Sequence, residues 1–150
     1  MKETKLNDNL GYLLNTTANA INTLMQRAIG EEEIDVPLEQ LKVLMYVSTH
    51  EGVNQQMICD SMNRVKPGVS RLVDGLEKKG LISRKEDKND RRNKILQVTK
   101  KGLHVRERFY PIAIKNLKGL ESSLGANESK ELKKHLIGIR EIILERLKSN

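Results

Sequence analysis

Residues 67–80 carry the pattern that most restricts how this chain can fold. The apolar positions of this stretch are Val69, Leu72, Val73 and Leu76. They stand at i, i+3, i+4 and i+7, the spacing that places side chains on one face of a helix. Pro67 suits the first turn of such a helix, with Lys66 at its cap, and Gly80 suits the position just past its end. The stretch therefore predicts a short amphipathic helix with one buried face.

A shorter helix is predicted directly ahead of it. Met57, Ile58 and Met62 show helical spacing, and residues 63–66 connect them to the helix that starts near Pro67. Two helices joined by so short a turn are typical of a helix-turn-helix, whose second helix enters the major groove of DNA.

The charged stretch RKEDKNDRRNK, residues 84–94, lies between two candidate strands, 81–83 and 95–98. We predict it to be the loop of a β-hairpin, which makes the arrangement a winged helix-turn-helix. Residues 64–101 hold 13 lysines or arginines against five acidic residues, a balance of +8, whereas the whole chain has a net charge of +7. The excess positive charge is confined to one segment, as expected of a module that binds a polyanion.

Long helices are predicted on both sides of this segment. Helical spacing of apolar residues extends over residues 5–29, after which Gly30 and an acidic run end the helix. A second helix is predicted to open at Pro37, where the missing N–H costs little, and to stop near Gly52.

Towards the C-terminus, Thr99 is expected to cap a helix that Pro111 bends and Gly125 ends, and Asn127 to cap the last helix. The last helix carries apolar residues at near-heptad spacing, Leu132, Leu136, Ile139, Ile143 and Leu147. A chain of 150 residues is most simply one domain. The fold class is therefore mainly α, with a small β-hairpin wing.

Four segments together resemble the MarR family of transcriptional regulators. They are PLEQLKVLMYV at 37–47, KPGVSRLVDGLEKKGLISR at 66–84, DRR at 90–92 and LQVTKKG at 96–102. The resemblance implies a homodimer, with dimerization helices at 1–30 and 100–150 and a DNA-binding lobe at 36–99. It also implies a regulator, more often a repressor, that binds a pseudo-palindromic operator on double-stranded DNA and releases it when a small aromatic or anionic effector binds.

The resemblance makes Arg92 the wing arginine that enters the minor groove, with Asp90 holding the wing in shape. A guanidinium suits the negative potential of a narrow minor groove, and a nearby carboxylate can fix it or a neighbour such as Arg84. Arg91 and Lys94 are expected to contact phosphate.

On the predicted recognition helix, Ser70 and Arg71 are the candidates for contact with base edges, since arginine pairs bidentately with guanine. Asp74 can equally hold Arg71 by an ion pair. The lysines are expected at the backbone, where contacts position the protein without reading sequence. The full set on this helix is Lys66, Gly68, Ser70, Arg71, Asp74 and Lys78. Two interpretations stay open, solvated charge or phosphate contact, for Lys85, Lys88, Lys100 and Lys101.

Other site chemistries find little support. The single cysteine, Cys59, lies ahead of the recognition helix and is interpreted as a packing residue rather than a redox switch. His50, His104 and His135 are far apart and form no metal-binding pair. The sequence offers no nucleophile with a nearby base and no phosphate-cradling glycine loop, so we expect neither an enzyme nor a cofactor.

No apolar run approaches the roughly 20 residues of a membrane span. The opening MKETKLNDNLG lacks the apolar core of a signal peptide, so the protein is expected in the cytoplasm. A second function class remains open: a winged-helix interaction module, in which the terminal helices bind another protein and DNA contact is incidental.

Overall fold

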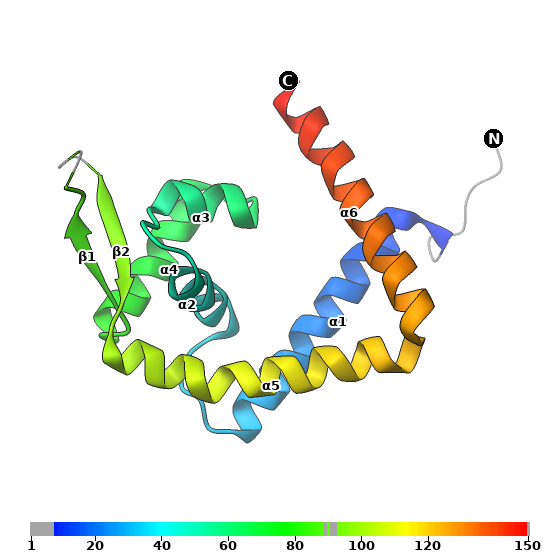
Figure 1. The fold of residues 1–150 in the computed structure, drawn as a ribbon, viewed down its shortest axis with the longest axis horizontal. Coiled ribbons are helices and arrows are strands. Elements are labelled where there is room, and N and C mark those ends of the chain that lie inside the picture. The colour runs from blue at the N-terminus through cyan, green and yellow to red at the C-terminus, as the bar shows by residue number, and fades with distance from the viewer. Residues whose placement is uncertain (1–7, 89, 91–92, 150) are drawn as a thin grey trace. The chain divides into compact units, whose positions relative to one another are not determined.

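The computed structural model describes residues 8–88, 90 and 93–149. Six helices and one antiparallel two-stranded sheet make up the described part (Figure 1). These elements are α1 (Leu10–Glu31), α2 (Leu38–Thr49), α3 (Gln55–Met62), α4 (Lys66–Lys78), β1 (Ile82–Glu86), β2 (Lys94–Val98), α5 (Lys100–Leu124) and α6 (Ala126–Lys148). The predicted fold class, mainly α with a hairpin wing, is confirmed. None of the described helices is both long and apolar enough to span a membrane.

The chain forms two compact units, Met1–Ile112 and Ala113–Asn150. The boundary falls inside α5, between Ile112 and Ala113 and one residue beyond Pro111. The first unit contains the core and the hairpin. In the second unit, Ser129 is the one buried residue among those that the structure describes, and most of the large apolar side chains of α6 are exposed in the protomer.

The core of the first unit lies where α2, α3, α4 and the base of the hairpin meet (Figure 1). Its fully buried side chains are Leu41, Val43 and Leu44 of α2, Val53, Ile58 of α3, Val69, Val73 and Leu76 of α4, and Leu81 and Ile82 at the base of the hairpin. Burial of one such side chain contributes roughly 1.5–3 kcal/mol. The predicted buried face of α4 is confirmed, except that Leu72 is only half-buried.

The hairpin strands are longer than predicted. They pair from Ile82↔Val98 to Glu86↔Lys94, so part of the stretch 84–94 lies in strands and not in the loop. An exposed two-stranded ribbon tolerates charges, since alternate side chains face solvent. The backbone N–H of Leu96 also donates to the carbonyl of Val53 at 2.7 Å, which fastens β2 to the segment between α2 and α3.

Predicted boundaries were wrong in three helices, α1, α4 and α6. The first helix begins at Leu10, where the Asn9 side chain accepts from the Tyr12 N–H at 3.1 Å. It runs past Gly30 to Glu31, because the chain turns at Glu33, whose φ is 51°.

The last helix begins at Ala126, and Asn127 is not its cap. Gly125 adopts a φ of 91° and turns the chain in a single residue, so no linker remains in which Asn127 could stand. Helix α4 begins at Lys66 with Val65 as its cap, one residue earlier than predicted, because the N–H groups of Gly68 and Val69 both donate to Val65.

The end of α4 follows the prediction. Gly80 has a φ of 70°, its N–H donates to Glu77, and the Leu81 N–H donates to Leu76 at 2.9 Å. This pair of bonds is the Schellman arrangement, which favours glycine at the left-handed position. The helix therefore passes into β1 through a turn of three residues, 79–81.

Helix α5 starts against the base of the hairpin. The Thr99 hydroxyl accepts from the Gly102 N–H at 3.0 Å, which confirms the predicted cap, and donates to the carbonyl of Gly80 at 2.7 Å. A Cβ atom at Gly102 would lie 2.0 Å from the carbonyl oxygen of Leu81. Only glycine lets α5 approach the strand backbone this closely.

Candidate DNA-binding surface

The face of α4 opposite the core presents the cations predicted to touch DNA. Lys66, Arg71 and Lys78 are exposed, while Ser70 and Gly68 are half-buried. None of the ion pairs found among the described residues includes these three cations. Their charges are therefore not cancelled by neighbouring carboxylates.

Asp74 lies on α4 but is paired with Arg84, not with Arg71. One guanidinium nitrogen of Arg84 donates to Asp74 at 2.5 Å and the other donates to Glu77. The Arg84 side chain is 25% exposed, so both bonds are partly shielded from water. Arg84 thus braces β1 against α4. Sequence reasoning missed Glu77, although its spacing from Asp74 on one helix was a visible signal.

The described part of the hairpin tip is organised by backbone contacts. The Asp87 N–H donates to the carbonyl of Asn93 at 3.0 Å, and the Asn93 N–H donates to the carbonyl of Asp90 at 2.9 Å. The Asn93 amide also contacts the Asp90 carboxylate at 3.4 Å. Asp90 is thus placed to shape the wing. Arg91 and Arg92, both predicted to contact DNA, lie outside the described residues.

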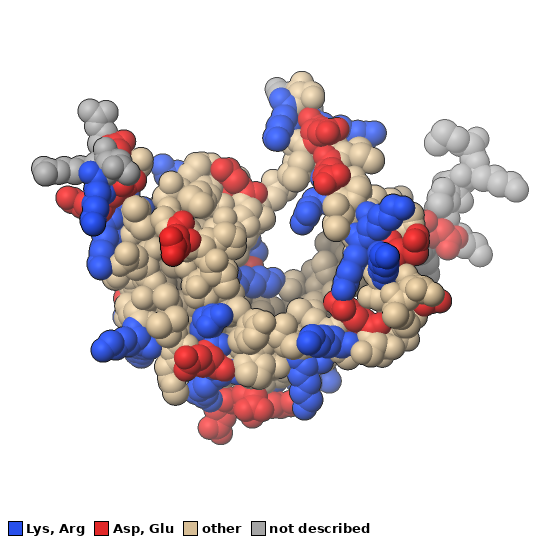
Figure 2. Space-filling view, in the orientation of Figure 1, with Lys and Arg blue, Asp and Glu red and all other residues tan. Residues whose placement is uncertain are grey.

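Exposed charges of both signs line the hairpin strands. Lys94 pairs with Glu86 across the ladder at 3.1 Å, and both side chains are more than half exposed. Lys85 and Lys88 are exposed as well. Figure 2 shows basic side chains along the outer edge of the hairpin, with acidic ones among them towards its tip. An exposed pair of this kind is worth at most about 1 kcal/mol, so it does not prevent Lys94 from meeting a phosphate.

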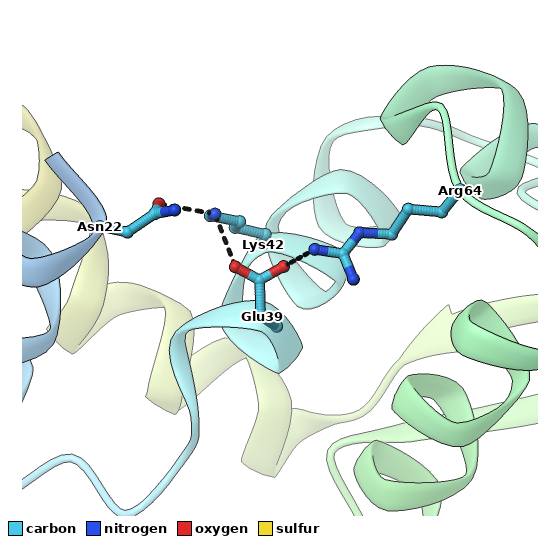
Figure 3. A network of polar contacts seen from close by, with 4 residues as sticks. All are labelled: Asn22, Glu39, Lys42 and Arg64. Carbon is cyan, nitrogen blue, oxygen red and sulfur yellow. Dashed lines mark hydrogen bonds and ion pairs between the residues drawn. The ribbon is translucent and has the colours of Figure 1, made fainter. Parts of the chain in front are cut away.

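The turn before α4 is tied to α2 and α1 (Figure 3). Arg64 donates to the Glu39 carboxylate, which also accepts from Lys42 at 2.7 Å. The Lys42 ammonium reaches the Asn22 side chain of α1 at 2.9 Å. This network fixes the turn ahead of α4 and explains why Arg64, although part of the basic segment, is not available as a free cation. Sequence analysis did not predict this long-range network.

Cysteine burial and the spacing of possible metal ligands concern two other candidate sites. Cys59 is buried in α3 at 6% exposure, as its interpretation as a packing residue requires. Over the part of the chain that the structure describes, no group of three or more His, Cys, Asp or Glu residues is close enough to hold a metal ion.

Comparison with known sequences gives a family match over the winged-helix lobe. Residues 36–94 match the model of the MarR family. An uncharacterized HTH-type transcriptional regulator of Bacillus subtilis (strain 168), YfiV, is 28% identical over 78 residues, which are 52% of this chain and 49% of that protein. A second such regulator, from Bacillus cereus (strain ZK / E33L), is 29% identical over 80 residues, 53% of this chain and 52% of its own length. The matches thus span about half the length of these Bacillus relatives.

Solved structures match over more of the chain. The S. aureus MepR–DNA complex superposes with a TM-score of 0.80 at 27% identity, covering 89% of this chain and 97% of MepR. The transcriptional repressor CouR bound to a 23-mer DNA duplex has a TM-score of 0.80 at 26% identity, covering 93% of this chain and 98% of CouR. The likeness therefore includes the long terminal helices as well as the winged-helix lobe.

Proposed function

We infer that this chain is a member of the MarR family of winged helix-turn-helix regulators, and we propose that it is a homodimer that binds a pseudo-palindromic operator on double-stranded DNA and regulates transcription. The proposal rests above all on α4. It is packed by its apolar face beside the hairpin and presents Lys66, Arg71 and Lys78 without carboxylate partners. MepR and CouR, which share the fold, have both been solved on DNA. Such a regulator would act in the cytoplasm, together with the DNA.

Within this surface the contacts divide by chemistry. Arg71 and Ser70 would read base edges in the major groove, and Lys66 and Lys78 would contact the backbone. Arg92, assigned from the family pattern, would enter the minor groove, and Arg91 and Lys94 would contact phosphates.

Gly68, Asp74, Arg84 and Asp90 would act mainly by shaping the surface. Gly68 keeps the first turn of α4 free of a side chain, and nothing lies within 4 Å of a Cβ built there. Arg84 is held by Asp74 and Glu77, so we assign it to fixing the wing rather than to a direct DNA contact.

The dimer would be formed by the terminal helices. In the protomer, α6 exposes large apolar side chains along its length, among them Leu132 at 45%, Leu136 at 40% and Ile143 at 48%. Exposed apolar residues in a continuous stripe mark an interaction surface. A second copy of this chain is the partner proposed, because two lobes are needed for two half-sites one helical turn apart.

Selection of bound fragments from the organism's own DNA would identify the operator and provide the decisive test. On that operator, Arg71→Ala is expected to relax discrimination at one base pair by about 1–3 kcal/mol, because a bidentate arginine–guanine contact is lost.

Arg92→Ala is expected to weaken binding without changing the dimer. Fluorescence anisotropy measures the affinity and sedimentation measures the dimer, with Glu51→Ala, an exposed position outside α4, the hairpin and the terminal helices, as the control. Unchanged affinity in both variants would favour the protein-interaction module.

We further propose that the protein is a repressor released by a small aromatic or anionic molecule. CouR is named a repressor and is also known bound to p-coumaroyl-CoA. A ligand that prefers one dimer conformation would change the spacing of the two α4 helices and lower operator affinity. Thermal-shift screening of phenolic acids and acyl thioesters should give a stabilising hit that also lowers operator affinity. A flat response across the panel would count against effector control and leave DNA binding untouched.

A further inference from the structure

A cleft of about 240 Å³ lies between the hairpin and the first turns of α3 and α4. Its polar lining includes the amides of Asn54, Gln55, Gln56 and Asn93 and the ammonium groups of Lys66 and Lys94. We infer that this cleft binds a phosphate of the DNA backbone, where one strand passes from the major groove to the minor groove. The inference rests on the proposed DNA-binding function and adds the start of α3 to the surface.

The position of the cleft identifies the part of DNA that it meets. Lys66 is the first residue of α4, the helix proposed for the major groove, and Lys94 is the first residue of β2 in the wing proposed for the minor groove. On a duplex, the two grooves are separated by the sugar-phosphate backbone of one strand. A protein that places these two elements in neighbouring grooves must therefore carry that backbone across the cleft between them.

The lining also has the right chemistry for a phosphate, which offers only acceptors to a protein. The side-chain oxygen of Asn54, Oδ1, already accepts from the Met57 N–H at 2.9 Å. The side-chain NH₂ group of Asn54 therefore supplies the donors for a ligand. Lys66 is exposed and belongs to none of the ion pairs described. We assign no phosphate contact to Gln56, because its amide nitrogen already donates to the Asp60 carboxylate at 2.8 Å.

Arg84 lines the cleft but is held by two carboxylates, which restrains its guanidinium. The new contacts therefore fall to Asn54 and Gln55, beside Lys66, whose backbone contact is part of the proposed function. Neutral amides at a phosphate add affinity and register without reading bases, so the cleft would serve every operator alike.

The test uses the full-length protein and its selected operator, with single phosphates replaced in turn by neutral methylphosphonates. Lys66→Ala is expected to weaken binding about tenfold and to reduce the slope of log K against log salt by about 0.9. Gln55→Ala is expected to weaken binding about fivefold with the slope unchanged, because it removes a neutral donor. At one phosphate, the loss of binding free energy caused by the methylphosphonate and the loss caused by each substitution should not add up when the two changes are combined. Such non-additivity marks a shared contact.

The control is Gln97→Ala, exposed on β2, which should not change affinity. Unfolding midpoints equal to wild type would show that the variants fold. Full additivity at every phosphate, with wild-type operator binding intact, would overturn the cleft contact alone. Absence of any operator preference in the wild type would instead overturn the proposed function. Competition by inorganic phosphate without coupling to a duplex phosphate would identify an anion site unrelated to DNA and also refute the inference.

Discussion

Leu136→Glu combined with Ile143→Glu is expected to convert the protein to a monomer and to abolish operator binding. The two residues stand seven apart on the exposed apolar stripe of α6. One buried leucine or isoleucine contributes roughly 1.5–3 kcal/mol, and a two-fold interface loses each residue twice. Loss of even one position then amounts to roughly 3–6 kcal/mol, on the order of 10²- to 10⁴-fold in the dimer dissociation constant.

Sedimentation equilibrium and fluorescence anisotropy on the operator would measure both effects. The control is Lys134→Glu, which adds negative charge on the opposite side of the same helix and should leave the dimer intact. The circular dichroism of the doubly substituted chain should retain its helical content. A double variant that stays dimeric would show that α6 is not the interface.

Gly102→Ala is expected to produce the largest loss of stability from a single methyl group. The new Cβ would lie 2.0 Å from the Leu81 carbonyl oxygen and 2.8 Å from Cγ2 of Val98. The first of these neighbours is backbone, so the start of α5 must move away from the hairpin and weaken the Thr99 cap. Overpacking of this kind costs about 1–3 kcal/mol, and the upper end is expected here because the clash is with main chain.

At a fixed protein concentration, Gly102→Ala should therefore lower the unfolding midpoint by roughly 5–10 °C. Gly30→Ala is the matched control, since that glycine lies within α1 and its Cβ would meet nothing within 4 Å. It should be neutral or stabilise by up to about 1 kcal/mol, because alanine favours the helix. Equal midpoints for the two variants would contradict the close approach at Gly102.

The elements that local rules define could be predicted from the sequence. The buried face of α4 follows from the spacing of Val69, Val73 and Leu76, and its end follows from the left-handed conformation that Gly80 permits. The exposure of Arg71 and Lys78 follows from the same helical geometry. These features depend on a few neighbouring residues, so one sequence is enough to predict them.

The features that depend on tertiary contacts could not be predicted. The partners of Arg84 come from ten and seven residues earlier in the chain, and the choice of Asp74 over Asp90 requires knowing how β1 lies on α4. Strand lengths were underestimated because the ends of an exposed ribbon are charged. The approach of Gly102 to Leu81 likewise exists only once the hairpin is packed against α5.

The ion pairs of Arg84 bear on the spacing of the proposed DNA contacts within one half-site. Because one guanidinium joins β1 to two carboxylates of α4, the helix that we propose for the major groove is tied to the base of the wing. Under the proposed function, a fixed number of base pairs would then separate the major-groove contacts of α4 from the minor-groove contact of the wing. We expect natural operators of this protein to vary in their bases and in the gap between half-sites. The number of base pairs between the two groove contacts of one half-site should stay the same.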